Sequence, residues 1–144
     1  MIEVLEHTGS DISALAECFR ILRPGGILIL FVPNKLYPWE SHPCHVGRFS
    51  IGRNIPLASW LPESLHRRIC HARIYTRRKL FRIARTTGFQ IRTMGYIFPP
   101  VDSFPLPKRF KQAYRRLSWT LEQSALAVFG VSIFVVFGKS QRVE

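Results

Sequence analysis

The fold class is predicted from residues Val4 to Asn34, which read VLEHTGSDISALAECFRILRPGGILILFVPN. The local signals in this stretch agree on one αβ unit. Either Ser10 or Asp11 is suited to cap a helix by accepting a hydrogen bond from a free N–H of its first turn. The apolar residues that follow recur at the spacing of one helix face: Ile12, Leu15, Ala16, Phe19 and Leu22. Pro24-Gly25-Gly26 cannot continue this helix and reverses the chain.

A buried strand is predicted directly after this turn. Residues 27–32 are six apolar residues without alternation, the pattern of a central strand that is covered on both faces, and Pro33 ends it. In an open α/β sheet, ligands bind at the carboxyl ends of the strands. Two such ends are predicted here, one at Glu6-His7 and one at Pro33-Asn34, and these four residues are the first candidates for a site.

Three motifs in this stretch, in this order and spacing, resemble the class I S-adenosylmethionine-dependent methyltransferases: Leu5-Glu6-His7, Leu22-Arg23-Pro24-Gly25-Gly26 and Pro33-Asn34. The resemblance is close over residues 1–34 and loose over 75–139. It implies S-adenosylmethionine as the cofactor, with contacts from Leu5, Glu6 and His7, and transfer of its methyl group to an acceptor. Because a histidine with an ordinary pKa near 6.5 can take the proton of a hydroxyl acceptor, His7 is the predicted catalytic residue.

The segment 35–74 loses periodicity and gains prolines and glycines, as a long functional excursion does. It resembles the substrate-side insertion that some members of the family place after the fifth strand, which makes the acceptor-binding candidates Pro33, Asn34, Trp39, Glu40 and His42. His7, Asn34, Glu40 and His42 are therefore expected to converge on one cavity.

Further elements follow from local signals in the rest of the chain. A helix is predicted from Pro62 to about Cys70, and a second one is capped by Thr76 and stopped by Gly88, with Leu80, Phe81, Ile83 and Ala84 on its apolar face. A strand starts at Phe89, a third helix runs from Lys108 to about Ala127, and a last strand covers 131–137. By resemblance this last strand is antiparallel and inserted between the fifth and sixth strands.

The predicted fold class is therefore α/β. Residues 1–144 are expected to form a single domain, the carboxyl-terminal part of a Rossmann-like methyltransferase sheet, with flanking helices and the basic insertion 35–74. The sequence contains no G-x-G-x-x-G loop to hold the cofactor. This chain alone is thus expected to be an incomplete, inactive enzyme that needs upstream strands or a separate cofactor-binding subunit. Its segment 2–5 is expected to be an unpaired sheet edge.

The charge is uneven. The formal net charge is +12, and residues 1–34 carry two basic and four acidic side chains whereas 35–85 carry eleven basic and two acidic ones. This pattern favours contact with an anionic surface, so peripheral contact with an anionic membrane is expected. The expected methyl acceptor is a small molecule or a lipid-linked group. Nucleic acid is not an expected partner because no recognised binding motif is present. The alternative function is a non-catalytic module that binds an anionic lipid surface or an acidic protein.

The three cysteines, Cys18, Cys44 and Cys70, are an odd number without framework spacing, which predicts a reduced, cytoplasmic chain without a disulfide. Several residues are of the types that bind zinc, but they lack paired C-x-x-C knuckles, so no metal site is expected: His42, Cys44, His45, Cys70 and His71. The apolar run 125–138 is shorter than the about 20 residues that span a membrane.

Overall fold

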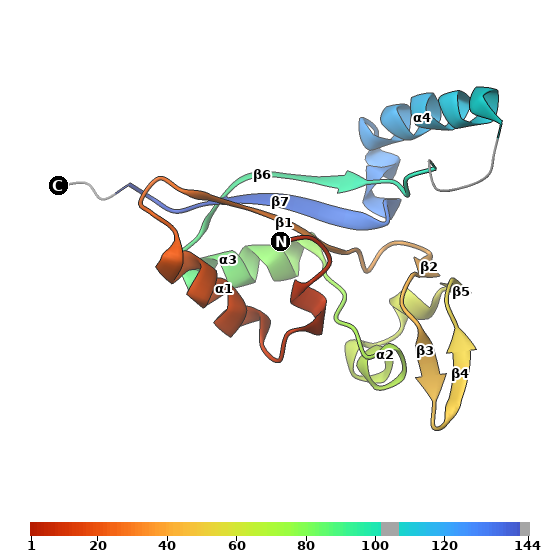
Figure 1. The fold of residues 1–144 in the computed structure, drawn as a ribbon, viewed down its shortest axis with the longest axis horizontal. Coiled ribbons are helices and arrows are strands. Elements are labelled where there is room, and N and C mark those ends of the chain that lie inside the picture. Colours follow the sequence, from red (N-terminus) through yellow and green to blue (C-terminus); the bar gives the residue numbers. More distant parts are fainter. Residues whose placement is uncertain (102–106, 142–144) are drawn as a thin grey trace.

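A three-stranded antiparallel sheet forms the centre of the computed structural model, which describes residues 1–101 and 107–141 (Figure 1). Its strands, in the order β1-β7-β6, are β1 (Ile27–Pro33), β7 (Ser132–Gly138) and β6 (Gln90–Ile97). Because β7 is antiparallel to both neighbours, β1 and β6 run in the same direction. The predicted insertion of the last strand between two earlier ones is confirmed.

Two helices, α1 (Asp11–Ile21) and α3 (Arg77–Thr87), cover one face of this sheet, and α4 (Lys108–Glu122) lies on its other side (Figure 1). The core between α1, α3 and the sheet is closed by fully buried side chains from each layer: Leu15, Leu80, Leu30 and Val135. The short 3₁₀ helix η1 (Leu5–His7) adds Leu5 to this core. The layer arrangement thus places the end of β1 beside η1.

The helix boundaries follow the predicted caps. Ser10 accepts a hydrogen bond from the Ser13 N–H at the start of α1, and Thr76 accepts one from the Lys79 N–H at the start of α3. Gly88 ends α3 with a φ of +83°, a conformation that favours glycine. Phe81 differs from the prediction, because its side chain is 46% exposed while Leu80, Ile83 and Ala84 are buried.

The prediction that β1 is covered on both faces is wrong for the described residues. Leu30 and Val32 are fully buried, whereas Ile27 and Ile29, on the opposite face of the strand, are almost half exposed. The segment that the sequence predicts as an unpaired sheet edge is paired with β1 on one side, because Ile2 forms a parallel bridge with Phe31. The Glu3 N–H donates to the Phe31 oxygen at 3.1 Å, and the Phe31 N–H donates to the Met1 oxygen at 3.0 Å.

The fold is α/β, but its ladders differ from a parallel Rossmann sheet. Every pair of named strands is antiparallel, and parallel pairing among the described residues is limited to two isolated bridges, Ile2 with Phe31 and Asn34 with Tyr75. The predicted Rossmann-like sheet is therefore seen only as its antiparallel end.

The insertion 35–74 contains more regular structure than its composition predicts. It forms two small antiparallel pairs, β2 (Trp39–Glu40) with β5 (Ile55–Pro56) and β3 (Cys44–Val46) with β4 (Phe49–Gly52). It continues through the 3₁₀ helix η2 (Ala58–Trp60) to the predicted helix α2 (Glu63–Cys70). These elements form a separate lobe below the end of β1 in Figure 1.

A disulfide joins Cys44 of β3 to Cys70 of α2, so the prediction of a chain without a disulfide is wrong. The two cysteines are 26 residues apart, and only the packing of α2 against β3 brings them together. Cys18 remains a free, half-buried thiol.

The segment after residue 107 also differs from the prediction. The helix α4 ends at Glu122, and a separate 3₁₀ helix, η3 (Ala125–Phe129), follows, where Ser124 accepts a hydrogen bond from the Leu126 N–H. The apolar run 125–138 is therefore divided between η3 and β7. Within the described ranges, no helix combines the length and apolar character that crossing a bilayer requires.

Candidate functional site

A cavity of about 570 Å³ lies at the carboxyl end of β1, between η1, the segment 41–53 and the start of β7. Its chemically informative lining residues are Glu6, His7, Phe31, His42, Arg53 and Ser132. The sheet supplies its apolar wall, and η1 and the insertion supply its titratable groups. The cavity therefore occupies the place where the sequence predicts a site.

Glu6 brings a buried carboxyl group to this cavity. Its side chain is fully buried, and neither carboxyl oxygen has a hydrogen-bond partner among the described residues. The nearest basic atom is Nε2 of His7, 3.7 Å from Oε1. Because burial disfavours the charged form, the pKa of the Glu6 carboxyl rises to about 7. Near neutral pH this carboxyl group is thus poised between its two protonation states.

His42 is held in one orientation by Glu40. The Nδ1 atom of His42 lies 2.7 Å from Oε1 of Glu40, and the backbone N–H of His42 donates to the same oxygen at 2.9 Å. Burial alone would lower the pKa of His42, but the bond to Glu40 and the negative charges of Glu40 and Glu6 raise it overall. The free nitrogen of the ring is Nε2, and the ring meets that of His7 edge-to-face at 5.7 Å.

Glu40 is a buried hub of the insertion. Its Oε2 accepts a hydrogen bond from Ser59 at 3.1 Å and lies 2.5 Å from Nε2 of His66. Burial disfavours its charge, yet the hydrogen bonds from His42 and His66 outweigh that effect and hold the pKa of Glu40 well below its usual range. Glu40 therefore positions His42 rather than lining the cavity itself.

The remaining predicted site residues lie elsewhere. The Leu5 side chain is in the hydrophobic core, Pro33 ends β1 with its carbonyl oxygen accepting from the Tyr75 N–H, and Trp39 is half exposed beside Tyr37. Asn34 is buried, and its amide donates to the carbonyl oxygens of Val128 and Gly130. The expected convergence is thus confirmed for His7 and His42, which line the cavity, whereas Glu40 contributes only by orienting His42. The expectation is wrong for Asn34, whose amide instead bonds the end of β1 to the chain before β7.

Sequence reasoning missed His66 and Arg53. His66 and Cys70 are four residues apart and therefore share one face of α2, and the structure places this face beside Glu40. Arg53 reaches the cavity because its Nε donates to the Ser41 oxygen at 2.9 Å, and no local pattern signals that contact.

Two groups of side chains among the described residues have the ligand types and proximity for a metal ion. In one, the ligand atoms of Glu6, His7 and His42 lie within 4.8 Å of one another, and the other comprises Glu40, His66 and Cys70. Each group contains one residue of the set that the sequence singles out, His42 in the first and Cys70 in the second. Cys44, His45 and His71 join no such group in the part of the chain that the structure describes.

Comparison with known proteins agrees with the resemblance. No protein-family model matches the chain. A probable S-adenosylmethionine-dependent methyltransferase of Mycolicibacterium smegmatis is 30% identical over 94 residues, which are 65% of this chain and 28% of that relative. A crystal structure of an S-adenosylmethionine-dependent methyltransferase from Mesorhizobium loti matches with a TM-score of 0.51 and 14% identity, over 96% of this chain and 59% of that one.

The chain thus spans only a part of the length of both relatives. The predicted resemblance is confirmed by both comparisons. The two comparisons together support a class I S-adenosylmethionine-dependent methyltransferase-like α/β fold for this chain.

Proposed function

We propose that this chain takes part in methyl transfer from S-adenosylmethionine and that the cavity at the end of β1 holds the methyl acceptor. Both relatives are named as S-adenosylmethionine-dependent methyltransferases, which supports methyl transfer with this cofactor. The observation that carries the acceptor site is the 570 Å³ cavity, in which the Glu6, His7 and His42 side chains from two segments meet beside the end of β1. Ligands bind at this edge of α/β sheets.

The protein's task in this reaction is mainly to position the acceptor, because methyl transfer is an in-line displacement at the methyl carbon. Phe31 and Ile97 give the cavity an apolar wall, and Arg53, Glu6 and the two histidines give it polar groups. In the metal-free cavity, the proton of a hydroxyl acceptor would pass to Nε2 of one of these histidines. His7 has its side chain 57% exposed at the cavity, where an entering acceptor can reach it.

We further propose that the cofactor is held jointly with residues outside these 144. The sequence offers no glycine-rich loop for the cofactor's methionine part. The open face of β1 supports this proposal, since Ile27, Ile29 and Ile2 leave apolar area exposed where further sheet or helix can pack.

Binding of S-adenosylmethionine tests both parts of the proposal. We expect weak binding of radiolabelled cofactor to the 144-residue chain in equilibrium dialysis. In a longer protein containing a glycine-rich strand-loop, we expect binding and formation of S-adenosylhomocysteine. His7→Gln should then lower turnover with little change in unfolding temperature, and His71→Gln, a histidine outside the cavity, serves as the matched control. Tight binding by the 144 residues alone would contradict joint binding, and no turnover in the longer protein would contradict the reaction.

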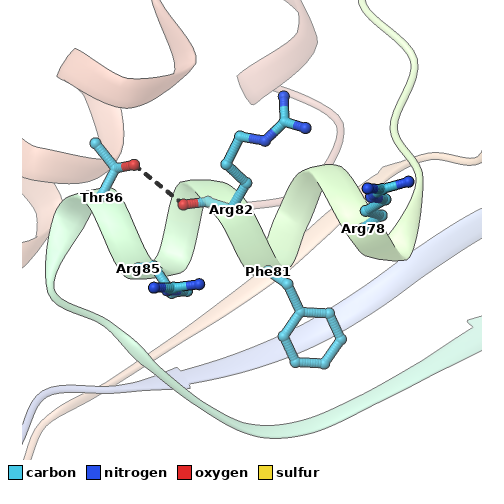
Figure 2. Close-up of a pocket in the computed structure, with 5 residues that line it drawn as sticks. All are labelled: Arg78, Phe81, Arg82, Arg85 and Thr86. Atoms are coloured by element: carbon cyan, nitrogen blue, oxygen red, sulfur yellow. Dashed lines mark hydrogen bonds between the residues drawn. The ribbon is translucent and has the colours of Figure 1, made fainter.

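A second candidate function is contact with an anionic surface through α3. Figure 2 shows Arg78, Phe81, Arg82 and Arg85 projecting from successive turns of this helix, around a hollow of about 560 Å³. Lys79, in contrast, is engaged by Glu63 at 2.6 Å. The α3 arginines and the half-exposed Phe81 ring thus combine cationic and apolar contacts, which suits a bilayer with anionic lipids.

A further inference from the structure

The Glu6 carboxyl group needs a partner that the described residues do not supply. Both of its oxygens are buried without a hydrogen bond, although its side chain lines an open cavity. Buried carboxylates in proteins are paired, hydrogen-bonded or bound to a metal ion. The imidazoles of His7 and His42 lie close to this carboxyl group, with the ligand atoms of all three residues within 4.8 Å of one another.

We propose that Glu6, His7 and His42 bind one divalent transition-metal cation of the Zn²⁺ type at the cavity. Two imidazoles and one carboxylate are a ligand set that such cations prefer, and three protein ligands leave coordination positions open towards the cavity. Metal–ligand bonds of about 2.0–2.2 Å place neighbouring ligand atoms roughly 3–3.5 Å apart. The 3.7 Å between Oε1 of Glu6 and Nε2 of His7 needs only a small rotation of the exposed His7 side chain.

The outer contacts of His42 fit a metal ligand. Metal-bound histidines commonly donate their second ring N–H to a carboxylate, which fixes the ring and its tautomer. His42 has this arrangement, because Nδ1 lies 2.7 Å from Oε1 of the buried Glu40 and leaves Nε2 as the ligand atom. Glu40 is in turn held by His66 and Ser59, so the imidazole is oriented before any cation arrives.

Charge and geometry favour this group over the neighbouring one. The carboxylates of Glu3 and Glu6 both line the cavity, against the single guanidinium of Arg53. In the second group, Glu40 and His66 already bond one another at 2.5 Å, too close for an ion between them, and the Cys70 sulfur is held in the disulfide. The first group is therefore the one with both a vacant carboxylate and open space.

Metal titration of the whole 144-residue chain tests the proposal without any methyl-transfer assay, so its failure is separate from failure of the proposed function. The chain is stripped with a chelator and titrated with Zn²⁺ against a chromophoric competitor, and with Co²⁺ for its absorption spectrum. We expect one equivalent of Zn²⁺, preferred over Mg²⁺ because imidazole ligands disfavour the harder ion. The Co²⁺ spectrum should lack a sulfur-to-metal charge-transfer band.

Glu6→Gln and His7→Gln should each weaken Zn²⁺ binding by at least roughly tenfold. Removing only an outer hydrogen-bond partner of a metal ligand already costs about that much, so removing a ligand should cost no less. His7 has an exposed side chain, so that variant tests the site even if another change disturbs folding. The matched control is His45→Gln with His71→Gln, a histidine pair with ring centroids 6.1 Å apart outside the cavity, and its affinity should not change. Equal binding by Glu6→Gln, an equal loss in the control, or a sulfur band would overturn the proposal.

Discussion

At the scale of single residues, Glu6 and Glu40 are two buried carboxyl groups with opposite environments. Glu6 has no hydrogen-bond partner for its oxygens among the described residues, whereas Glu40 is bonded by His42, Ser59 and His66. Burial therefore raises the pKa of Glu6, whereas in Glu40 the hydrogen bonds outweigh burial and lower the pKa. This contrast makes Glu6 a candidate for function and Glu40 a support for the insertion.

The pH dependence of stability checks the Glu6 environment in the metal-free chain. A carboxyl whose pKa rises from 4.5 to about 7 on folding binds its proton more tightly in the folded state, so the free energy of unfolding falls as pH rises between these values. The loss amounts to at most about 3 kcal/mol. Glu6→Gln removes the titrating group and with it this pH-dependent loss. Urea unfolding should therefore show that the variant is more stable than the parent at pH 8 but not near pH 4.5. An equal difference at both pH values would contradict the raised pKa.

Replacing Glu40 should be costly. Glu40→Gln leaves two buried imidazoles without their carboxylate, and removing one partner of a buried pair costs about 3 kcal/mol or more. Urea unfolding at pH 7 measures this loss. Glu17→Gln is the matched control, because Glu17 pairs with Arg20 on the exposed surface of α1, where ion pairs contribute little. Similar effects of the two changes would show that Glu40 is not a hub.

At the scale of elements, the start of α3 rests on one side-chain hydrogen bond. The Thr76 hydroxyl oxygen accepts from the Lys79 N–H at 3.2 Å. Thr76→Ala should lower the free energy of unfolding by about 1 kcal/mol, the usual cost of losing an N-cap. Thr86→Ala is the control in the same helix, since the Thr86 hydroxyl bonds only the Arg82 carbonyl (Figure 2) and alanine is the better helix former. A loss in Thr86→Ala as large as in Thr76→Ala would contradict the capping role.

The disulfide between β3 and α2 stabilises the insertion. Closing a 26-residue separation restricts the unfolded chain, which corresponds to about 3 kcal/mol in the loop-entropy account. The double variant Cys44→Ser with Cys70→Ser should lose a similar free energy of unfolding. Added reductant should lower the stability of the parent but not that of this double variant. Cys18→Ser, which removes only a half-buried free thiol, is the control. Unchanged unfolding of the parent in reductant would contradict a structural disulfide.

At the scale of the whole molecule, the basic residues are divided by the sheet. Figure 1 places α3 and α4 on opposite sides, so one flat surface cannot meet both helices in the same way. The formal charge of +12 therefore does not act as one patch. We expect α3 to dominate binding to an anionic bilayer, because its arginines and a half-exposed aromatic ring line the same hollow.

Vesicle co-sedimentation measures this division. Changing Arg78, Arg82 and Arg85 to Gln should reduce binding to anionic vesicles by on the order of 1 kcal/mol per residue at low salt, and screening should erase the difference at high salt. The control changes Lys108, Arg109 and Arg116 of α4 to Gln, with the same loss of charge. Equal effects of the two triple changes would contradict an α3 surface, and equal binding to neutral vesicles would contradict an electrostatic cause.

The features of this protein that depend on near neighbours in the chain could be predicted from the amino-acid sequence. Caps at Ser10 and Thr76, the stop at Gly88 and the apolar periodicity are local, so α1, β1 and α3 could be predicted. The predicted strand end at Glu6 and His7 is wrong, because these residues lie in the 3₁₀ helix η1. The family resemblance added the insertion of β7 between its neighbours.

Contacts between distant segments depend on packing and could not be predicted from local patterns. The Glu40–His66 contact and the Cys44–Cys70 disulfide each join residues 26 apart, and the Asn34 amide reaches Gly130 across 96 residues. A local pattern carries no information on which of several histidines, cysteines and carboxylates will meet, because that choice follows from how α2 packs against β3. The sequence predicted that His7 and His42 meet in one cavity, whereas the burial of Glu6 beside both imidazoles follows from how η1 packs in the fold.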